Sequence, residues 1–508
     1  MSVQSAYKEL LALYREYEIL NQAVSILEWD FETYMPEKGV DQRSEQLALL
    51  AALVHDRITN PHIGELLNEV KASSEYEFMN SYEKRNIYLL ERDHTKAIRL
   101  PREFIEEYAR QTTIGVHIWK RAKKEKNFEI FKPELKKIIE LVKKRASLLD
   151  PEKAPYNVLL DEYEPGMTQE VYTQIFQDLK IGLLPIIEKC VTAPNKPDPT
   201  VLRRNCPISI QRKLSEDLSS VVDYDLTRGR IDETEHPFTT GYMDDVRITT
   251  HYYEDDFTNS FFSVLHEAGH GIYEQNLDSE LKYQPVGASA SYGLHESQSR
   301  LIENVIGRSP EFWDFYYPRL IQHTGNLFKD LEPQILYRAI NNVQRSKIRV
   351  EADEMTYCLH IIIRFEIERD LMAGKIKVDQ LPEIWNKKYK DYLGVEIQND
   401  SEGVMQDTHW AGGLLGYFPT YALGSLYNAQ MLHSIKKDLT DYSDLLRKGN
   451  LSPIILWLKE KIHSQGKLYD PSEFIERITG ESMNAKYFLE YLEEKYSSIY
   501  GWEFQGGH

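Results

Sequence analysis

The segment FFSVLHEAGHGIYEQ, residues 261–275, constrains the fold more than any other stretch, because it sets two histidines and a glutamate at helical spacing. His266 and His270 are four residues apart. On an α-helix, which has about 3.6 residues per turn, both imidazoles lie on one face and can bind one ion. Glu267 follows the first histidine, where its carboxylate can take a proton from a water on that ion and later return it to a leaving group. This HExxH pattern predicts a hydrolytic zinc site, and an amphipathic core helix with the same letters is the alternative interpretation.

The residues after the motif indicate which kind of zinc site this is. The metzincin extension requires Gly and His where Tyr273 and Asn276 stand, so that class is excluded. A third ligand must come from elsewhere, and the helix-like segment 289–307 carries Glu296 as the candidate. Two histidines and one glutamate leave a fourth position open for water, which is typical of a catalytic zinc site.

Two polar residues near Glu296 can have either of two roles. His295 directly precedes it, and Glu303 lies two helical turns beyond it. Either side chain can orient a metal ligand from outside the coordination sphere, and either can be an ordinary polar residue at the surface or the edge of the core. The sequence leaves both interpretations open.

Composition restricts the partners of the chain. Its 508 residues are 42% hydrophobic and 28% charged, which predicts a soluble globular protein. A formal net charge of -19 argues against nucleic acid and anionic membranes as partners, because a polyanion is repelled over most of such a surface. The three cysteines lack metal-site spacing and are odd in number, which fits a reducing cytoplasm. The N-terminus has no apolar signal core and no run of 18 apolar residues occurs, so we expect neither export nor a membrane span.

Helical periodicity dominates the chain. We expect two long helices between Tyr7 and about Thr59, one on each side of Pro36, and further helices up to residue 190. Residues 226–256 alternate β-branched and aromatic with polar residues, which predicts one small antiparallel sheet next to the zinc helix, where an edge strand can hold an extended substrate. After residue 306 the expected helices are 310–328, 332–347, 353–374, 379–393, 421–439, 452–464, 471–478 and 484–498. We expect one unit, residues 1–508, with a helical N-terminal part at about 1–225, a catalytic core at about 226–440 and a helical C-terminal part at about 441–508.

Six short segments carry a family resemblance. They are HPF at 236–238, DVRIT at 245–249, HEAGH at 266–270, HESQSR at 295–300, IRVEAD at 348–353 and GVMQDTHW at 403–410. With these motifs the whole chain resembles the carboxypeptidase Taq family of thermostable metallocarboxypeptidases. The resemblance implies a mostly α, zincin-like unit with a deep groove, usually a homodimer, with Glu296 as the third ligand. It also implies one divalent metal per subunit, zinc or alternatively cobalt, and release of single C-terminal amino acids from peptides with broad side-chain specificity, by attack of a metal-bound water activated by Glu267.

A carboxypeptidase must recognise the free α-carboxylate of its substrate. A guanidinium does so through two parallel hydrogen bonds and stays charged at any working pH. Arg349 is the first candidate and Arg247 the second, each within a family motif. The alternative for each is a structural ion pair, with Asp353 or Asp245 as the partner.

The remaining candidates are a set of histidines and tyrosines. His236 and His409 look like lining at the closed end of the groove, together with Gln406 and Asp407. Tyr417 and Tyr421 stand four residues apart after a glycine-rich segment. A phenol or imidazole aimed at the scissile oxygen would stabilise the oxyanion, for which we favour Tyr421 and His409, while aromatic core packing is the alternative.

Two other kinds of enzyme and one non-enzyme remain as rivals. An aminopeptidase of this type usually carries a GAMEN-like segment before HExxH, and none is present. An endopeptidase needs a groove open at both ends, which the sequence does not show. A helical scaffold or holdase that kept the motif without turnover would be expected to lose Glu267, which is intact.

Overall fold

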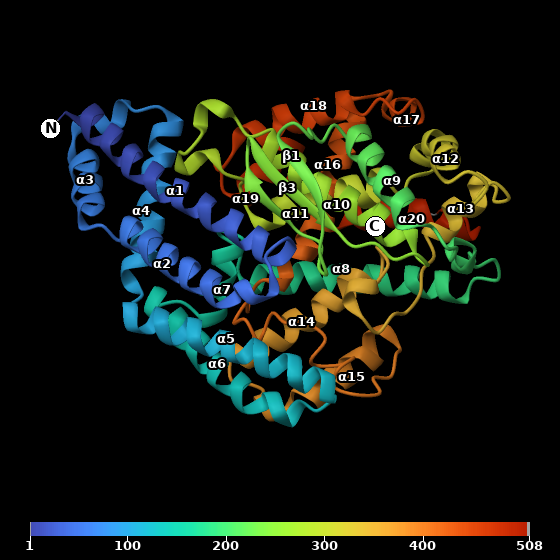
Figure 1. Ribbon diagram of the computed structural model, residues 1–508, viewed down its shortest axis with the longest axis horizontal. Helices are drawn as coiled ribbons and strands as arrows, with labels where there is room; N and C mark the ends of the chain where they lie inside the picture. The colour runs from blue at the N-terminus through green and yellow to red at the C-terminus, as the bar shows by residue number, and fades with distance from the viewer. Residues whose placement is uncertain (1, 505–508) are drawn as a thin grey trace.

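The computed structural model describes residues 2–504, which form α-helices around one small three-stranded sheet (Figure 1). The helices before the sheet are α1 (Val3–Thr33), α2 (Val40–Ile58), α3 (Pro61–Ala72), α4 (Ser81–Arg99), α5 (Arg102–Glu125), α6 (Phe128–Leu149), α7 (Pro155–Tyr163), α8 (Gln169–Thr192) and α9 (Ile208–Val221). The helices after it are α10 (Phe257–Gln275), α11 (Tyr292–Arg300), α12 (Pro310–Thr324), α13 (Pro333–Ile340), α14 (Tyr357–Met372), α15 (Leu381–Leu393), α16 (Phe418–Asp438), α17 (Tyr442–Arg447), α18 (Ser452–Lys461), α19 (Pro471–Thr479) and α20 (Lys486–Tyr500). The expected mostly helical fold is confirmed.

One predicted helix, 332–347, is too long. Helix α13 ends at Ile340, seven residues early. The backbone N–H of Val343 donates to the Tyr500 hydroxyl, and that of Gln344 donates to the Asp353 carboxylate. These tertiary partners replace the i−4 carbonyls of a helix, so periodicity alone could not place the end.

The sheet is mixed rather than wholly antiparallel as predicted. Its strands are β1 (Gly229–Glu233), β2 (Thr239–Tyr242) and β3 (Asp245–Thr250), in the order β1-β3-β2. Strands β2 and β3 form the expected antiparallel pair, but β1 runs parallel to β3. The chain reverses between β1 and β2, and β3 then inserts between them, so β3 is antiparallel to one neighbour and parallel to the other. The edge strand next to the site is therefore β2, not the strand that leads into α10.

Helix α11 packs between α10 and α16, and two glycines permit the close approach. A Cβ on Gly269 of α10 would lie 2.6 Å from the Gln298 carbonyl oxygen of α11. A Cβ on Gly424 of α16 would lie 2.4 Å from Cγ of Glu296. Any side chain at either position would push the helices apart, because both contacts are well inside van der Waals distance. Gly269 lies between His266 and His270, so the same approach brings both histidines to Glu296.

The helix continues past Arg300 with wider turns. Residues Leu301–Ile306 form a π-helix directly after α11. Such segments are rare and are frequent at functional sites. Glu303 lies in the first turn of this segment.

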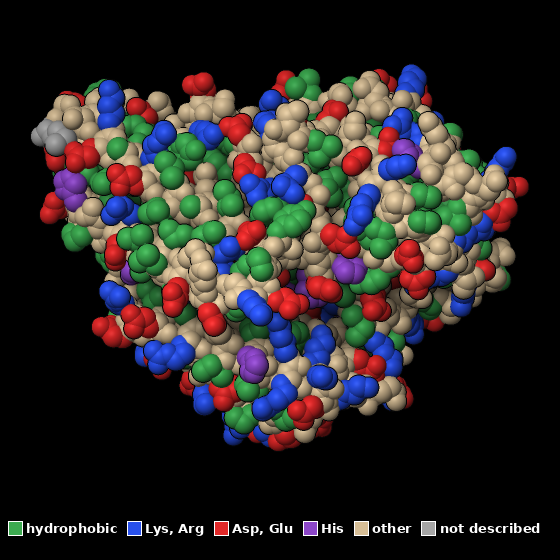
Figure 2. All heavy atoms as spheres, in the orientation of Figure 1, with side chains coloured by type: hydrophobic (Ala, Val, Ile, Leu, Met, Phe, Trp, Pro, Cys, Tyr) green, Lys and Arg blue, Asp and Glu red, His purple; other side chains and the backbone are tan. Residues whose placement is uncertain are grey.

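Three hydrophobic clusters lie under these helices. The largest extends from Ala122 to Tyr500 and includes the apolar side of α10, and a second joins α1, α3 and α4. A small third cluster consists of Leu89, Leu281, Val286 and Leu468. Several apolar side chains of α1 and α2 stay exposed, among them Ile26 and Leu49, and green side chains gather over these helices in Figure 2. Elsewhere on that face acidic and basic side chains are interspersed. None of the helices within residues 2–504 has the length and apolar character needed to cross a membrane. The three-part division at about 225 and 440 stays a prediction.

Candidate metal centre and substrate cavity

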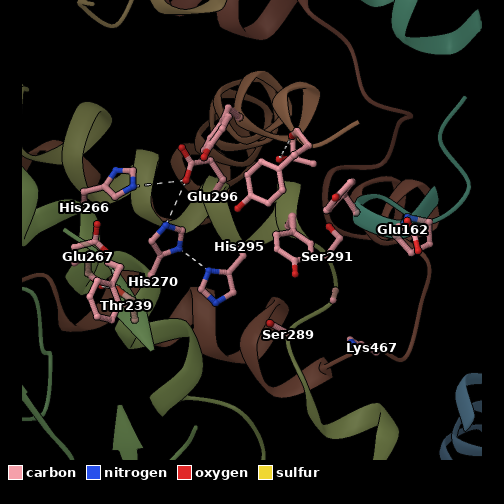
Figure 3. Close-up of a pocket in the computed structure, with 18 of the residues that line it drawn as sticks. Glu162, Thr239, His266, Glu267, His270, Ser289, Ser291, His295, Glu296 and Lys467 are labelled. Carbon is pink, nitrogen blue, oxygen red and sulfur yellow. Dashed lines mark hydrogen bonds and ion pairs between the residues drawn. The ribbon is translucent and has the colours of Figure 1, made fainter. Parts of the chain in front are cut away.

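His266, His270 and Glu296 converge on one point (Figure 3). Their ligand atoms all lie within 4.8 Å of one another. Nε2 of His266 is 3.6 Å and Nε2 of His270 is 3.3 Å from the same oxygen, Oε2 of Glu296. The other carboxylate oxygen, Oε1, accepts a hydrogen bond from Nε of Arg300 at 2.7 Å, which fixes the orientation of the carboxylate. One carboxylate oxygen and two imidazole nitrogens on one side are a donor set that suits a catalytic zinc ion.

The ring of His266 is oriented by Glu303. Oε2 of Glu303 lies 2.9 Å from Nδ1 of His266, and its Oε1 accepts from Arg308 at 3.1 Å. A carboxylate can only accept here, so Nδ1 carries the proton and Nε2 keeps its lone pair for the ion. Of the two roles open for Glu303, the structure places it as an orienting residue.

His270 is oriented by a second histidine. Its Nδ1 lies 2.5 Å from Nδ1 of His295, whose Nε2 lies 2.9 Å from Oε1 of Glu274. Glu274 accepts from His295 Nε2–H, so His295 Nδ1 is left as an acceptor for the proton on His270 Nδ1. That proton assignment leaves Nε2 of His270 free to bind the ion. His295 therefore also contacts a ligand from outside the cluster.

Burial and charge set the protonation of the metal-free cluster. Burial opposes the charging of His266, but the carboxylates of Glu296, Glu303 and Glu267 more than offset this and raise its pKa to about 9. Burial and the neighbouring His295 lower the pKa of His270 to about 3. For Glu296, burial is outweighed by Arg300 and the histidines, which hold its pKa well below its usual range. An ion that binds here must displace one proton, mainly from His266.

Glu267 is buried next to the cluster and is held by the edge strand. The Thr239 hydroxyl of β2 donates to Oε2 of Glu267 at 2.6 Å. Burial raises the pKa of Glu267, against the opposing effects of His266 and this hydrogen bond. A raised pKa makes a carboxylate a stronger base, which suits proton abstraction from water.

A cavity of about 600 Å³ opens beside the cluster. Its lining includes Glu267, the three ligand candidates, Tyr417 and Tyr421. Tyr417 packs with Tyr163 and Tyr292 at ring-centroid distances of 5.1 and 5.4 Å, and Tyr163 and Tyr292 are 5.6 Å apart. These three rings form an aromatic wall that can cover the apolar parts of a peptide.

Tyr421 connects the cavity to His409. Nε2 of His409 lies 3.3 Å from the Tyr421 hydroxyl, while its Nδ1 is buried without a hydrogen-bond partner among the described residues. Burial lowers the pKa of His409 to about 4, so at neutral pH the ring is neutral. The two side chains predicted to act at the oxyanion thus lie together, and their role stays a prediction.

Arg349 lies behind Tyr421 rather than in the cavity lining. Its Nε and Nη2 donate to Oδ1 of Asp407 at 3.0 and 2.9 Å, and its Nη1 donates to the Tyr357 hydroxyl at 2.8 Å. Its Cζ is 5.1 Å from the ring centroid of Tyr421. Asp353, the ion-pair partner considered from the sequence, instead accepts hydrogen bonds from Thr356.

Two other predicted residues lie apart from the ligand cluster. Arg247 donates to Asp245 from Nε and Nη2, both at 2.8 Å, and its Cζ lies 4.2 Å from the Trp29 ring. This is the ion pair that the sequence offered as the alternative. His236 is exposed, although Pro237 and Phe238, the next two residues of its motif, line the cavity.

The comparisons with known proteins agree with this geometry. The family described as carboxypeptidase Taq (M32) metallopeptidase matches residues 9–496. The chain belongs to this family. Carboxypeptidase 1 of Bacillus subtilis is 38% identical and the match covers 98% of this chain and 100% of that protein. Thermostable carboxypeptidase 1 of Thermus thermophilus is 39% identical, with 99% and 100% covered.

Solved structures of M32 carboxypeptidases have the same fold. The enzyme from Deinococcus radiodurans R1 superposes with a TM-score of 0.95 at 34% identity, covering 98% of this chain and 100% of that one. The Pyrococcus furiosus carboxypeptidase gives a TM-score of 0.93 at 36% identity, covering 97% and 99%. This M32 chain is therefore a metal-dependent carboxypeptidase, a peptide hydrolase that acts at the C-terminus.

Sequence reasoning missed several residues of this M32 site. Thr239 carries no signal of its own beyond its place after the HPF motif. Glu274 stands 21 residues before His295 in the sequence, and Arg364, which donates to Oδ2 of Asp407, stands 43 residues before its partner. Only the packing of separate segments of the chain brings such pairs together.

Proposed function

We propose that this metallocarboxypeptidase releases single C-terminal amino acids, with broad side-chain specificity, and that His266, His270 and Glu296 hold one zinc ion, with cobalt as the alternative. The convergence of the three ligand atoms beside Glu267 at the wall of one cavity supports this proposal. When bound, the ion would polarise the scissile carbonyl and acidify a water.

Glu267 is the general base in this proposal. Its carboxylate takes a proton from the attacking water and later delivers it to the nitrogen of the leaving amino acid. Thr239 holds the carboxylate while Oε1 stays free of any hydrogen bond to the described residues. Glu303 and the His295–Glu274 pair keep both histidines in the tautomer that presents Nε2.

The test is product analysis on an N-terminally blocked peptide. The enzyme should release one free amino acid from the free C-terminus and should act only poorly on the amidated peptide. Internal cleavage of the amidated peptide would indicate an endopeptidase. On a matched peptide with a free N-terminus, release of the N-terminal amino acid would indicate an aminopeptidase. No cleavage of any peptide by metal-loaded protein would favour a holdase.

Tyr421 and His409 are proposed to stabilise the oxyanion. We expect Tyr421→Phe to lower kcat by about 10² to 10³ fold, because only the hydroxyl is removed and one such donor has an effect of this size. Tyr417→Phe, which removes a hydroxyl from the neighbouring aromatic wall, should lose much less. The measurement is kcat for both variants on the same peptide, and a Tyr421→Phe enzyme within a few fold of wild type contradicts the role.

Arg349 is proposed to bind the terminal carboxylate, with Arg247 as the second candidate. Three of the five N–H groups of Arg349 are used by Asp407 and Tyr357, which leaves two for a ligand. A movement of the Tyr421 ring, which packs near the Arg349 guanidinium and lines the cavity, would expose them. His236 and Tyr417 complete the proposed substrate-binding set.

We expect Arg349→Ala to lower kcat/KM on free-ended peptides at least tenfold, since a charged hydrogen bond contributes about 1.5 to 3 kcal/mol. Arg349→Lys should recover part of the loss, because a point charge cannot reproduce the planar fork. C-terminal amidation removes the same interaction, so its effect and that of Arg349→Ala should fall well short of adding. If the effects of amidation and of Arg349→Ala add in full, Arg349 does not bind the terminal carboxylate and Arg247 becomes the candidate.

We also infer a homodimer in the cytoplasm, which rests on the family resemblance and on the cysteine usage of the chain. Light scattering should give about twice the 59.5 kDa of one chain, and a mass of one chain would contradict the dimer. Cell fractionation tests the location.

A further inference from the structure

Two cationic side chains line the cavity away from the metal ligands. Figure 3 shows Lys467 and Glu162 on the opposite side of the cavity from His266 and Glu267. Arg92, on α4, lines the same cavity and lies within electrostatic range of Asp161, the neighbour of Glu162. Arg92 and Lys467 come from segments 375 residues apart, which only the fold brings to one cavity.

Neither cation is satisfied within residues 2–504. Nε of Arg92 is buried without a hydrogen-bond partner, and its nearest carboxylate, Asp93, is 3.8 Å away, too far for a hydrogen bond. No carboxylate of the described chain lies within 4.0 Å of Nζ of Lys467; Glu18 acts on it only at longer range. Glu162 also lines this end, but its two oxygens accept from Nη1 and Nη2 of Arg145 at 2.6 and 2.9 Å. The cavity therefore ends in two cations with unused donors and one carboxylate that is already paired.

The position of Arg92 and Lys467 suits contact with the part of a peptide that precedes the scissile bond. The aromatic wall of Tyr163, Tyr292 and Tyr417 lines the same cavity, and Lys467 lies across this cavity from His266. Arg349, the proposed partner of the terminal carboxylate, is bonded to Asp407 and Tyr357, and among the described residues it is Arg92 and Lys467, not Arg349, that line this cavity. The ring contacts from Tyr421 through Tyr417 to Tyr163, the residue next to Glu162, have two steps of 5.3 and 5.1 Å. Together these steps correspond to roughly three extended residues at about 3.4 Å each.

We propose that Arg92 and Lys467 form a cationic subsite for an acidic side chain, roughly two or three residues before the scissile bond. The inference deepens the proposed exopeptidase action and rests on it. A protein with a net charge of -19 repels acidic peptides over most of its surface, so a local pair of cations decides whether such a peptide can enter. The subsite makes peptides with Asp or Glu near the C-terminus preferred substrates. This preference does not depend on which amino acid is released.

The experiment compares N-terminally blocked peptides that differ only by Glu or Gln at the second or third residue before the scissile bond. At low salt, wild type should show a kcat/KM about tenfold higher for the Glu peptide at one of these positions, which is the effect of one charged hydrogen bond. Salt should reduce this ratio, because exposed charges are screened. Arg92→Gln/Lys467→Gln should bring the ratio to within twofold of one. Arg110→Gln and Lys461→Gln, at exposed cations outside the cavity lining, should keep it.

Charge reversal guards against a loss caused by misfolding. Arg92→Glu/Lys467→Glu should prefer a Lys peptide to the Glu peptide, a gain that a damaged protein would not show. A wild-type ratio near one at both positions, or a ratio that survives the double Gln substitution, overturns the subsite. Release of a dipeptide instead of one amino acid also overturns it, because the pair would then bind the terminal carboxylate. Failure to release any C-terminal residue from the Gln peptide by wild type would instead contradict the proposed function itself.

Discussion

Glu267→Gln should keep the metal and the fold but lower kcat by about 10² to 10⁴ fold or more, since an amide cannot accept the proton of the attacking water. The substitution is nearly isosteric. The Thr239 hydroxyl, 2.6 Å from Oε2 of Glu267, can donate to the new amide oxygen or accept from its nitrogen. The loss should therefore report the missing base rather than a displaced helix. The measurement is kcat together with metal content per subunit.

Thr239→Val is the matched control for the Glu267 substitution. It removes the hydrogen bond that holds the carboxylate but leaves the base, so it should lose less than Glu267→Gln. Equal metal content in both variants would show that the ligand cluster is intact. A Gln variant within a few fold of wild type would place the base elsewhere.

Removal of the metal by a chelator should abolish carboxypeptidase activity and lower Tm, and added zinc should restore both. Three side chains converge on the site, and a bound ion stabilises only the folded chain in which they do so. Without the ion, Oε2 of Glu296 keeps only partial compensation from the histidines and from Ser299. The measurements are activity and thermal unfolding before and after dialysis with and without zinc. Full activity of a protein with no bound metal would contradict the proposed role of all three residues as ligands of a catalytic metal.

The pH dependence of metal binding has a defined sign. The raised pKa of His266, about 9 in the metal-free chain, means that the ring carries an extra proton at pH 7. Metal binding requires the neutral ring, so affinity should increase as pH rises towards 9 and level off above it. Glu303→Gln removes one carboxylate that favours this proton and should flatten the dependence. Affinity measured by competition with a chelator at several pH values provides the test.

The sequence predicts the parts of this site that depend on local spacing. His266, Glu267 and His270 share one helix, so the periodicity of an α-helix suffices to bring them together. Glu296 could be named as a candidate because an open zinc site needs one further ligand, and the helix-like segment 289–307 contains this glutamate. The confirmed fold class, mostly helical with a small sheet, rests on the same periodicities.

What the sequence could not predict depends on long-range packing. The parallel pairing of β1 with β3 is set by which edge of β3 the returning chain meets, and alternation of side chains is the same in both directions. For the alternative role of Arg349, a structural ion pair, the sequence suggested nearby Asp353 as the partner, whereas the partner in the structure is Asp407, which also accepts from Arg364. Arg364 is wholly buried on α14 with no motif around it. Such ion pairs form because a buried guanidinium needs a carboxylate, wherever in the chain the fold places one.

The π-helix at Leu301–Ile306 makes the number of residues between the carboxylates of Glu296 and Glu303 important. Oε2 of Glu296 faces Nε2 of His266, and Oε2 of Glu303 faces Nδ1 of the same ring. A single helix thus meets both ends of one imidazole, and its π-helical turns begin between the two carboxylates. Deleting one residue here would restore α-helical turns and swing Glu303 away, whereas an exchange of one apolar side chain for another of similar size would leave both contacts in place. Among related chains, we expect that a deletion between these two glutamates would disable the site, while many substitutions there would not.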